Sequence, residues 1–211
     1  MTQNNRDILY LASQSASRRE LLQAAGIQFK TINQTADESK VVRTGSVNNF
    51  VMSIARAKMK SVVLPECVEL ENDYLFVLTA DSLTFHKESD TVFGKPKDKD
   101  DARRMLNFKR GKTIEVVTGC CLEKKVWKKG AWRIEAGYEW EVSGALEFVM
   151  TPEDIELYLE FVPQALHASG AGVIEGFGFN FLKSVNGSYT AIMGLPIFEL
   201  RQALKRMQFK F

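Results

Sequence analysis

The spacing of apolar residues along this chain predicts an alternation of short strands and helices. Residues 9–11 form a brief apolar run, which is typical of a buried strand. Apolar positions within 21–25 then fall on one face of a helix, and Gly26 is placed to end it. A second short strand is predicted at 29–32. The chain therefore opens with a strand, a loop and a helix, followed by another strand.

A longer helix is predicted to begin at Ser46, which has the side chain of an N-cap. Val47, Val51 and Ile54 share its apolar face, and Lys58 occupies the next position on that face. The Lys58 ammonium either extends past the edge of the core into water or projects into a cleft that the helix helps to form. The pattern alone leaves both interpretations open.

The apolar run at 75–78 predicts a strand that is covered on both faces. It ends in the polar residues 79–82, and the ends of central strands in α/β sheets open onto ligand crevices. Asp81 is thus either a carboxylate in a functional crevice or an aspartate in a turn. Downstream, Gly94 permits close backbone approach to a ligand, and Pro96 fixes the chain direction after Lys95.

The second half of the chain continues the alternation. A helix is predicted from Asp98 or Asp100 to Gly111, with Lys109, Arg110 and Lys112 on a solvated face. The remaining predictions are a strand at 113–122, a β-meander over 126–149 with turns at 129–130 and 136–137, a helix capped by Thr151, a hairpin turning at Asn186-Gly187 and a last helix from 197 to 207.

The composition limits the class of protein but does not indicate its function. Of 211 residues, 45% are apolar and 26% charged, which is ordinary for a globular protein, and the formal net charge of +2 does not indicate a nucleic-acid binder. The cysteines Cys67, Cys120 and Cys121 make a poor disulfide framework and suggest a reducing compartment. With no signal segment or membrane-spanning apolar run, a cytoplasmic protein with no membrane partner is expected.

Two polar stretches offer candidate chemistry. Residues 13–19 place serines and two arginines at a helix start, where exposed N–H groups attract a phosphate-bearing ligand. Ser17 and Glu20 also have capping-box spacing, so these residues alternatively just close the helix. The pair Asp37-Glu38 either helps to hold a divalent metal or lies in a solvated turn.

No single motif decides the function, but their order does. The motifs are LASQSASRRELL at 11–22, DES at 37–39, IARAK at 54–58, ADS at 80–82, GKP at 94–96, TG at 118–119, EGFG at 175–178, NGSY at 186–189 and GLP at 194–196. Their collinear order resembles the Maf family of nucleotide pyrophosphatases. The resemblance implies a single domain over 1–211 of the mixed α/β class, with a largely central β-sheet flanked by helices and two lobes around a nucleotide cleft. It also implies hydrolysis of a nucleoside triphosphate to the monophosphate and pyrophosphate.

The resemblance further implies a role for each matching residue. The catalytic aspartate corresponds to Asp81, acting as general base or positioning a metal-supported water. Glu38 and Asp81 are expected to hold Mg²⁺, or another divalent cation such as Mn²⁺. The residues expected to bind the triphosphate, whose roughly four negative charges must be neutralised before water can attack, are Ser13, Arg18, Lys58 and Lys95.

Base specificity is expected to involve Ser17, Ser82 and Glu175. The family branch that acts on dTTP and UTP carries arginine, threonine and glutamine at these positions and a lysine-alanine-glycine run where this chain has 168–170. The branch that acts on 7-methyl-GTP carries tryptophan, glutamine and glutamate, with a leucine-histidine pair that is found here at 166–167.

Glu175 favours 7-methyl-GTP as the substrate. A carboxylate accepts both N1–H and N2–H of guanine, offsets the charge of a methylated purine and repels the oxygens of uracil. Ser17 argues against this choice because serine does not stack on a purine. The alternatives are therefore a dTTP/UTP pyrophosphatase, a third specificity class, or a nucleotide-binding cell-division regulator with weak catalysis. The family is also compatible with a homodimer.

Overall fold

The computed structural model describes residues 6–66 and 74–211, so Cys67 lies outside the described part of the chain. None of the helices in those residues is long and apolar enough to span a membrane. The strands are β1 (Leu9–Leu11), β2 (Phe29–Thr31), β3 (Tyr74–His86), β4 (Thr91–Phe93), β5 (Thr113–Lys128), β6 (Ala131–Phe148) and β7 (Leu182–Gly187). The α-helices are α1 (Ala16–Ala24), α2 (Val47–Lys60), α3 (Lys99–Lys109), α4 (Pro152–Phe161), α5 (Tyr189–Ile192) and α6 (Ile197–Arg206).

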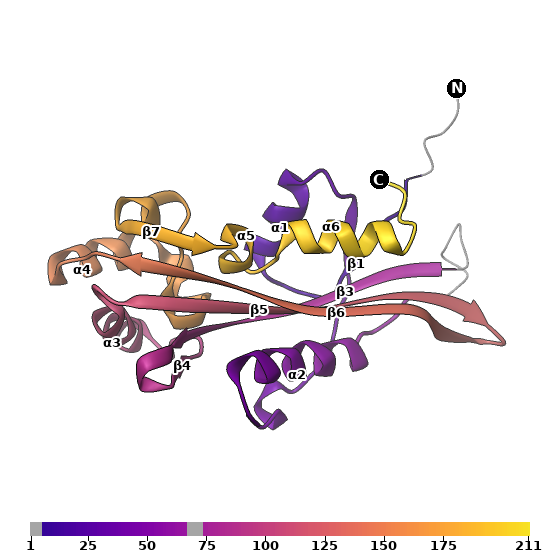
Figure 1. Cartoon of the computed structure of the whole chain (residues 1–211), viewed down its shortest axis with the longest axis horizontal. Helices are drawn as coiled ribbons and strands as arrows, with labels where there is room; N and C mark the ends of the chain where they lie inside the picture. The colour runs from indigo at the N-terminus through magenta and orange to yellow at the C-terminus, as the bar shows by residue number, and fades with distance from the viewer. Residues whose placement is uncertain (1–5, 67–73) are drawn as a thin grey trace. The chain divides into compact units, whose positions relative to one another are not determined.

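These strands form one mixed sheet, in the order β2-β1-β3-β5-β6-β7 with β4 paired to β3. Strand β1 is parallel to both β2 and β3, whereas the β3–β4 and β6–β7 pairs are antiparallel. A mixed sheet flanked by helices confirms the expected α/β class (Figure 1).

The chain divides into two compact units. The first unit comprises 1–81, 119–141 and 194–211, and the second comprises 82–118 and 142–193. Strands β3, β5 and β6 each contribute residues to both units. The expected single domain of two lobes stays a prediction.

In the first unit, helix α2 lies on one side of the strands, and α1 and α6 lie on the other (Figure 1). The face of α2 that meets the sheet buries Met52, Ala55 and Met59 against Leu75 and Val77. Such a continuous apolar contact gives about 25 cal/mol per Å² of buried surface, so it fixes α2 firmly on the strands.

Gly119 allows a close approach between β5 and α2. A Cβ atom at this position would lie 3.2 Å from the backbone of Val51 and 2.9 Å from the sulfur of Met52. Any larger residue would therefore push α2 away from the sheet, which explains the glycine of the TG motif physically.

The second unit has its own apolar core, in which Tyr158 of α4 is the largest fully buried side chain. Its hydroxyl accepts a hydrogen bond from the Val173 amide at 2.7 Å. The core also contains Leu106 of α3, Phe148 of β6 and Phe181. Helices α3 and α4 thereby pack against each other and against residues of β5 and β6 in one core.

Several predicted elements were placed correctly. Ser46 caps α2 by accepting from the Asn49 amide, and Asp98 rather than Asp100 caps α3. Thr151 caps α4 in a capping box with Asp154, and the turn at 129–130 joins β5 to β6.

Other predictions were wrong because tertiary pairing overrides local signals. Strand β3 does not end near Asp81 but continues to His86, and residues 136–137 lie inside β6 rather than in a turn. Asn186-Gly187 does not turn a hairpin, because β7 pairs with β6 and the next residues form α5. The N-cap of α1 is Ser15, which accepts from the Arg18 amide, so the expected capping box of Ser17 and Glu20 was also wrong.

Lys109 departs most from its prediction. It was expected on a solvated face, but it is only 3% exposed, and its ammonium donates to the Gly170 carbonyl. Burial lowers the pKa of Lys109 from 10.5 to about 7. Between these values the unfolded chain holds a proton that the folded chain has released, so stability rises with pH across that range.

We expect Lys109→Met to remove the increase in stability with pH. In the wild type the free energy of unfolding should increase above pH 7, by at most about 1.4 kcal/mol per pH unit for one proton. Urea unfolding between about pH 6 and pH 9 measures it. Lys112→Met, which changes an exposed lysine nearby, should keep the wild-type slope. If Lys109→Met kept the wild-type dependence of the free energy of unfolding on pH, the lowered pKa of Lys109 would not be its cause.

Candidate functional site

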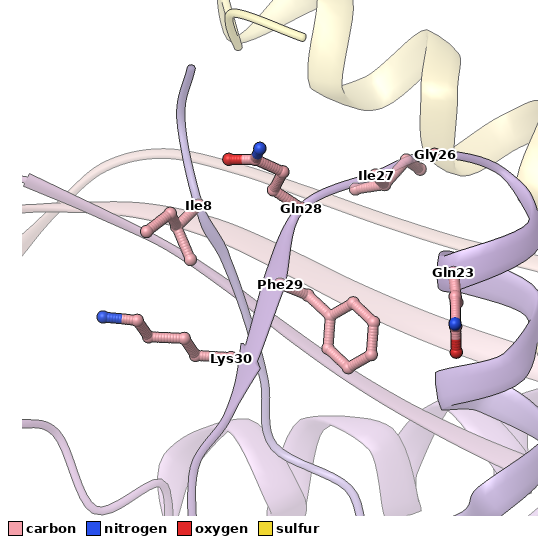
Figure 2. Close-up of a pocket in the computed structure, with 7 residues that line it drawn as sticks. All are labelled: Ile8, Gln23, Gly26, Ile27, Gln28, Phe29 and Lys30. Atoms are coloured by element: carbon pink, nitrogen blue, oxygen red, sulfur yellow. The ribbon is translucent and has the colours of Figure 1, made fainter. Parts of the chain in front are cut away.

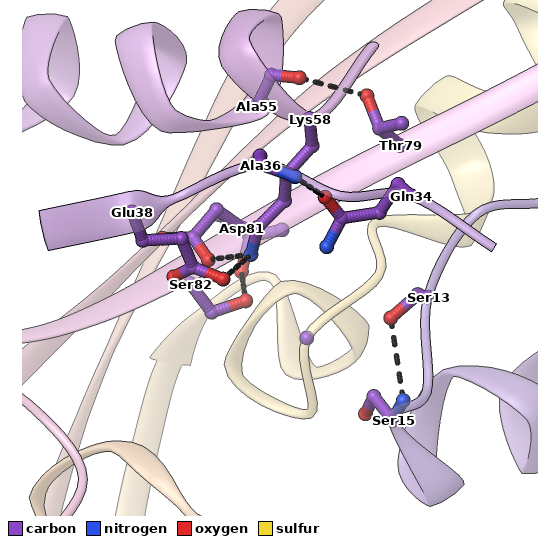
Figure 3. A network of polar contacts seen from close by, with 12 residues as sticks. Ser13, Ser15, Gln34, Ala36, Glu38, Ala55, Lys58, Thr79, Asp81 and Ser82 are labelled. Atoms are coloured by element: carbon purple, nitrogen blue, oxygen red, sulfur yellow. Dashed lines mark hydrogen bonds and ion pairs between the residues drawn. The ribbon is translucent and has the colours of Figure 1, made fainter. Parts of the chain in front are cut away.

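A buried lysine lies between two carboxylates in the first unit. The Lys58 Nζ atom is 2.6 Å from Asp81 Oδ1 and 3.0 Å from Glu38 Oε1. Lys58 and Asp81 are 7% and 8% exposed, whereas the Glu38 side chain is half exposed. Figure 3 shows both acidic side chains converging on the ammonium. Lys58 therefore does not extend past the core into water but is held as a buried ion.

Parallel strands explain how residues far apart in sequence meet here. Strands β2, β1 and β3 run in the same direction, and Leu11 at the end of β1 is in register with Leu78. Glu38 follows the carboxyl end of β2 in the chain, and Asp81 lies inside β3, three residues after the end of its pairing with β1. The carboxyl ends of parallel strands meet at one edge of a sheet, which is where α/β proteins bind ligands.

The face of β3 that turns toward α2 carries the polar contacts. Residues two apart point the same way in a strand, so Thr79 and Asp81 share this face. Thr79 Oγ1 donates to the Ala55 carbonyl at 2.9 Å, and Lys58 lies one helical turn after Ala55 (Figure 3). This bond fixes the register between helix and strand, and it places the ammonium opposite Asp81.

Only one of the two neighbouring acids reaches Lys58. Asp37 accepts from the amide and hydroxyl of Ser39 and pairs with Lys40, so it caps a short 3-10 turn at Glu38–Lys40. The expected pair of acids at 37–38 thus divides into a capping aspartate and a glutamate directed at Lys58.

The loop after β1 forms a second polar cluster in the same unit. Arg18 is 8% exposed, and its Nε donates to the Gly194 carbonyl at 2.8 Å while its Nη1 donates to Ser13 Oγ at 3.1 Å. Ser13 Oγ also accepts from the Ser15 amide (Figure 3). The structure therefore brings Ser13 and Arg18 together at the start of α1, with Ser17 half-buried in its first turn.

Three further predicted residues belong to the second unit. Lys95 is exposed and follows Gly94. Ser82 Oγ lies 2.7 Å from Thr118 Oγ1, which itself donates to the Ala191 carbonyl at 2.7 Å. Because the single hydroxyl proton of Thr118 is used in that bond, Ser82 donates to Thr118. The TG motif thus orients the hydroxyl of Ser82.

Glu175 precedes the 3-10 turn at Gly176–Asn180. Burial and the negative charge of Glu175 raise the pKa of Tyr189. The carboxylate consequently lies within electrostatic reach of the Tyr189 hydroxyl.

Comparison with known proteins adds the family. A model of Maf-like proteins matches residues 8–207, which is nearly the whole chain. The chain belongs to the Maf-like protein family.

Its Maf-like relatives include proteins named dTTP/UTP pyrophosphatase from three bacteria. The protein of Acholeplasma laidlawii is 32% identical over 198 residues, which cover 94% of this chain and 95% of the relative. That of Anaeromyxobacter sp. (strain Fw109-5) is 34% identical over 200 residues, covering 94% and 88%. That of Caldicellulosiruptor bescii is 32% identical over 199 residues, covering 94% of each.

One pocket in the first unit is lined by none of the predicted site residues. It has a volume of about 430 Å³ and lies between the end of α1 and strand β2 (Figure 2). Its walls are mostly apolar and carry no acid, so it offers no obvious chemistry. The lining residues are Ile8, Gln23 and 26–30.

Two residues whose hydroxyl groups make structural hydrogen bonds were not singled out from the sequence. Thr79 was seen only as part of the polar end of a strand, although it sets the register of α2. Ser169 was seen only within a small-residue loop, although its hydroxyl contacts both Thr84 and Phe93. For Ser169, the signal in the sequence was a hydroxyl side chain within a loop of small residues.

The buried ion pair predicts a specific pattern of stability. Lys58→Met leaves Asp81 buried without its partner, which should lower the free energy of unfolding by about 3 kcal/mol. Adding Asp81→Asn removes the charge and should recover more than half of that loss. Urea unfolding at neutral pH measures both variants.

A matched control is available on the same helix. Arg56 pairs with Glu139 at 2.8 Å, but both side chains are about half exposed, so Arg56→Met should cost less than about 1 kcal/mol. A Lys58→Met loss no larger than this would show that the Lys58–Asp81 pair is not a buried constraint.

Proposed function

We propose that this chain hydrolyses nucleoside triphosphates to the monophosphate and pyrophosphate. The observation that carries the proposal is the buried Lys58 ammonium between Asp81 and Glu38, where β3 extends beyond its parallel pairing with β1. Relatives covering almost the whole chain are named pyrophosphatases, which supports the same class of hydrolase.

The cations match the charge of such a substrate. A nucleoside triphosphate carries roughly four negative charges, which repel an attacking oxygen until they are neutralised. Arg18 has a fixed guanidinium beside the Ser13 hydroxyl, and both groups can donate to phosphate oxygens. Lys58 and Lys95 supply two further positive charges.

Asp81 is proposed as the general base. Its carboxylate takes a proton from a water molecule as the water oxygen forms a bond to the α-phosphorus. The bond between the α-phosphorus and the bridging oxygen breaks, and pyrophosphate leaves with that electron pair. Lys58 keeps the Asp81 carboxylate fixed in orientation through the 2.6 Å contact.

The acidic residues also fit a divalent cation. Mg²⁺ is commonly bound by one or two carboxylates together with water and substrate phosphates. Glu38 and Asp81 both contact the Lys58 ammonium, and each does so through one oxygen of its carboxylate, so two neighbouring carboxylates are present. Residues 6–66 and 74–211 contain no cluster of three or more metal-binding side chains. We propose that these two residues hold Mg²⁺ or Mn²⁺. When bound, the cation would neutralise phosphate charge.

Two substrate classes remain in competition. The names of the relatives support dTTP and UTP, and we propose these as the main substrates. Glu175 supports 7-methyl-GTP as the second candidate, since its carboxylate pairs with the donors of guanine and repels uracil oxygens.

The proposed reaction is tested by product analysis. Wild-type protein with Mg²⁺ and a panel of dTTP, UTP, CTP, GTP and 7-methyl-GTP should release pyrophosphate and the monophosphate. Asp81→Asn should lower kcat by about 100-fold or more, because it removes the base. Glu139→Gln, which alters an exposed acid, should leave kcat unchanged. Absence of turnover with every triphosphate would overturn the proposal.

The same panel separates the two substrate classes. Higher kcat/KM for dTTP and UTP would support the main candidate, and preference for 7-methyl-GTP would support the second. Glu175→Gln should shift the ratio toward the pyrimidine substrates, because an amide both donates to and accepts from uracil. An unchanged ratio would exclude Glu175 from base selection.

A further inference from the structure

Ser169 connects two strands of the second unit. Its Oγ accepts from the Thr84 amide of β3 at 3.0 Å and donates to the Phe93 carbonyl at the end of β4 at 2.7 Å. Thr84 Oγ1 in turn donates to the Ser169 carbonyl at 3.0 Å. Three hydrogen bonds therefore hold this one residue against the β3–β4 pair.

Gly170 extends the connection to the next residue of the chain. Its amide donates to the Gly94 carbonyl at 2.8 Å, and its own carbonyl accepts from the buried Lys109 ammonium. Gly170 has a φ of +63°, and a Cβ atom there would lie 3.0 Å from the Thr84 side chain. Only glycine fits this backbone conformation at such close range.

These bonds fix the backbone on one side of Lys95, and proline fixes it on the other. Gly94 is tied through its carbonyl, and Pro96 is buried with a restricted φ. The residue before a proline is itself confined to extended conformations. The exposed Lys95 side chain therefore projects from a backbone with little freedom.

We propose that Ser169 is a positioning residue that acts through Lys95 by holding the Phe93–Gly94 segment. The inference rests on the proposed function, in which Lys95 contacts the triphosphate. Lys109 supports the same loop from α3 through the Gly170 carbonyl. An ammonium carried on a fixed backbone binds the phosphate charge with a smaller loss of conformational freedom.

A double-mutant cycle in kcat/KM tests this role. Ser169→Ala should lower kcat/KM about ten-fold when Lys95 is present, mostly through a higher KM, and less than about two-fold in the Lys95→Ala background. A residue that acts through Lys95 has little left to lose once that ammonium is gone. A merely structural serine would cost the same factor in both backgrounds.

Matched variants show whether the loss of activity comes from the hydrogen bonds of Ser169. Ser169→Thr retains the hydroxyl and should recover most of the activity, while Thr84→Val removes one of the three bonds and should give a smaller loss of the same kind. Ser89→Ala disrupts hydroxyl contacts to His86 and Thr91 at the other end of β4 and should change kcat/KM less than two-fold.

The outcomes separate this inference from the proposed function. Equal losses in both Lys95 backgrounds, or a Ser89→Ala loss as large as that of Ser169→Ala, would overturn the positioning role while hydrolysis stands. No turnover of any triphosphate by the wild type would overturn the proposed function, and the role of Lys95 with it.

Discussion

The ion pair between Lys58 and Asp81 constrains how the first unit is built. Removing an ammonium and a carboxylate from water costs several kcal/mol per ion, and only close pairing compensates for it. Helix α2 must therefore lie on β3 at one register, which the Thr79–Ala55 hydrogen bond and the glycine at 119 both permit. The strand order then brings Glu38 to the same ammonium.

This arrangement supports the proposal of an anionic substrate. The polar groups gather where β1 and β2 end beside the longer strand β3, and Arg18 and Ser13 lie at the start of the first helix. Cation, carboxylate and hydroxyl are all held by contacts within the first unit, so ordering them costs little when a ligand arrives. The membership of the Maf-like family agrees with chemistry on a triphosphate.

Much of this could be predicted from the sequence. Lys58 stood out because a charge interrupted an apolar helical face, and Asp81 because it followed an apolar strand run. Ser46 and Thr151 predicted helix starts correctly, since capping depends on neighbouring backbone groups alone. The pairing of Glu38 rather than Asp37 with Lys58 required the fold, because adjacent residues of one turn point in different directions.

The failed predictions share a physical cause. Asn186-Gly187 has a strong local preference for a hairpin, but pairing of β7 with the long strand β6 prevails. Lys109 reads as a solvated residue because its partner, the Gly170 carbonyl, lies far away in sequence. The sequence did not decide the substrate base either, since Ser17 and Glu175 favour different substrate classes. The relatives, for their part, are named dTTP/UTP pyrophosphatase.

The central claim is that water attacks the α-phosphorus of the triphosphate, with Asp81 as the general base. Hydrolysis of dTTP or UTP by the wild-type protein in ¹⁸O-labelled water, followed by mass spectrometry of the products, tests it directly. The account predicts that the label enters the nucleoside monophosphate and that pyrophosphate stays unlabelled. Label in pyrophosphate, or release of single phosphates with a nucleoside diphosphate, would contradict it.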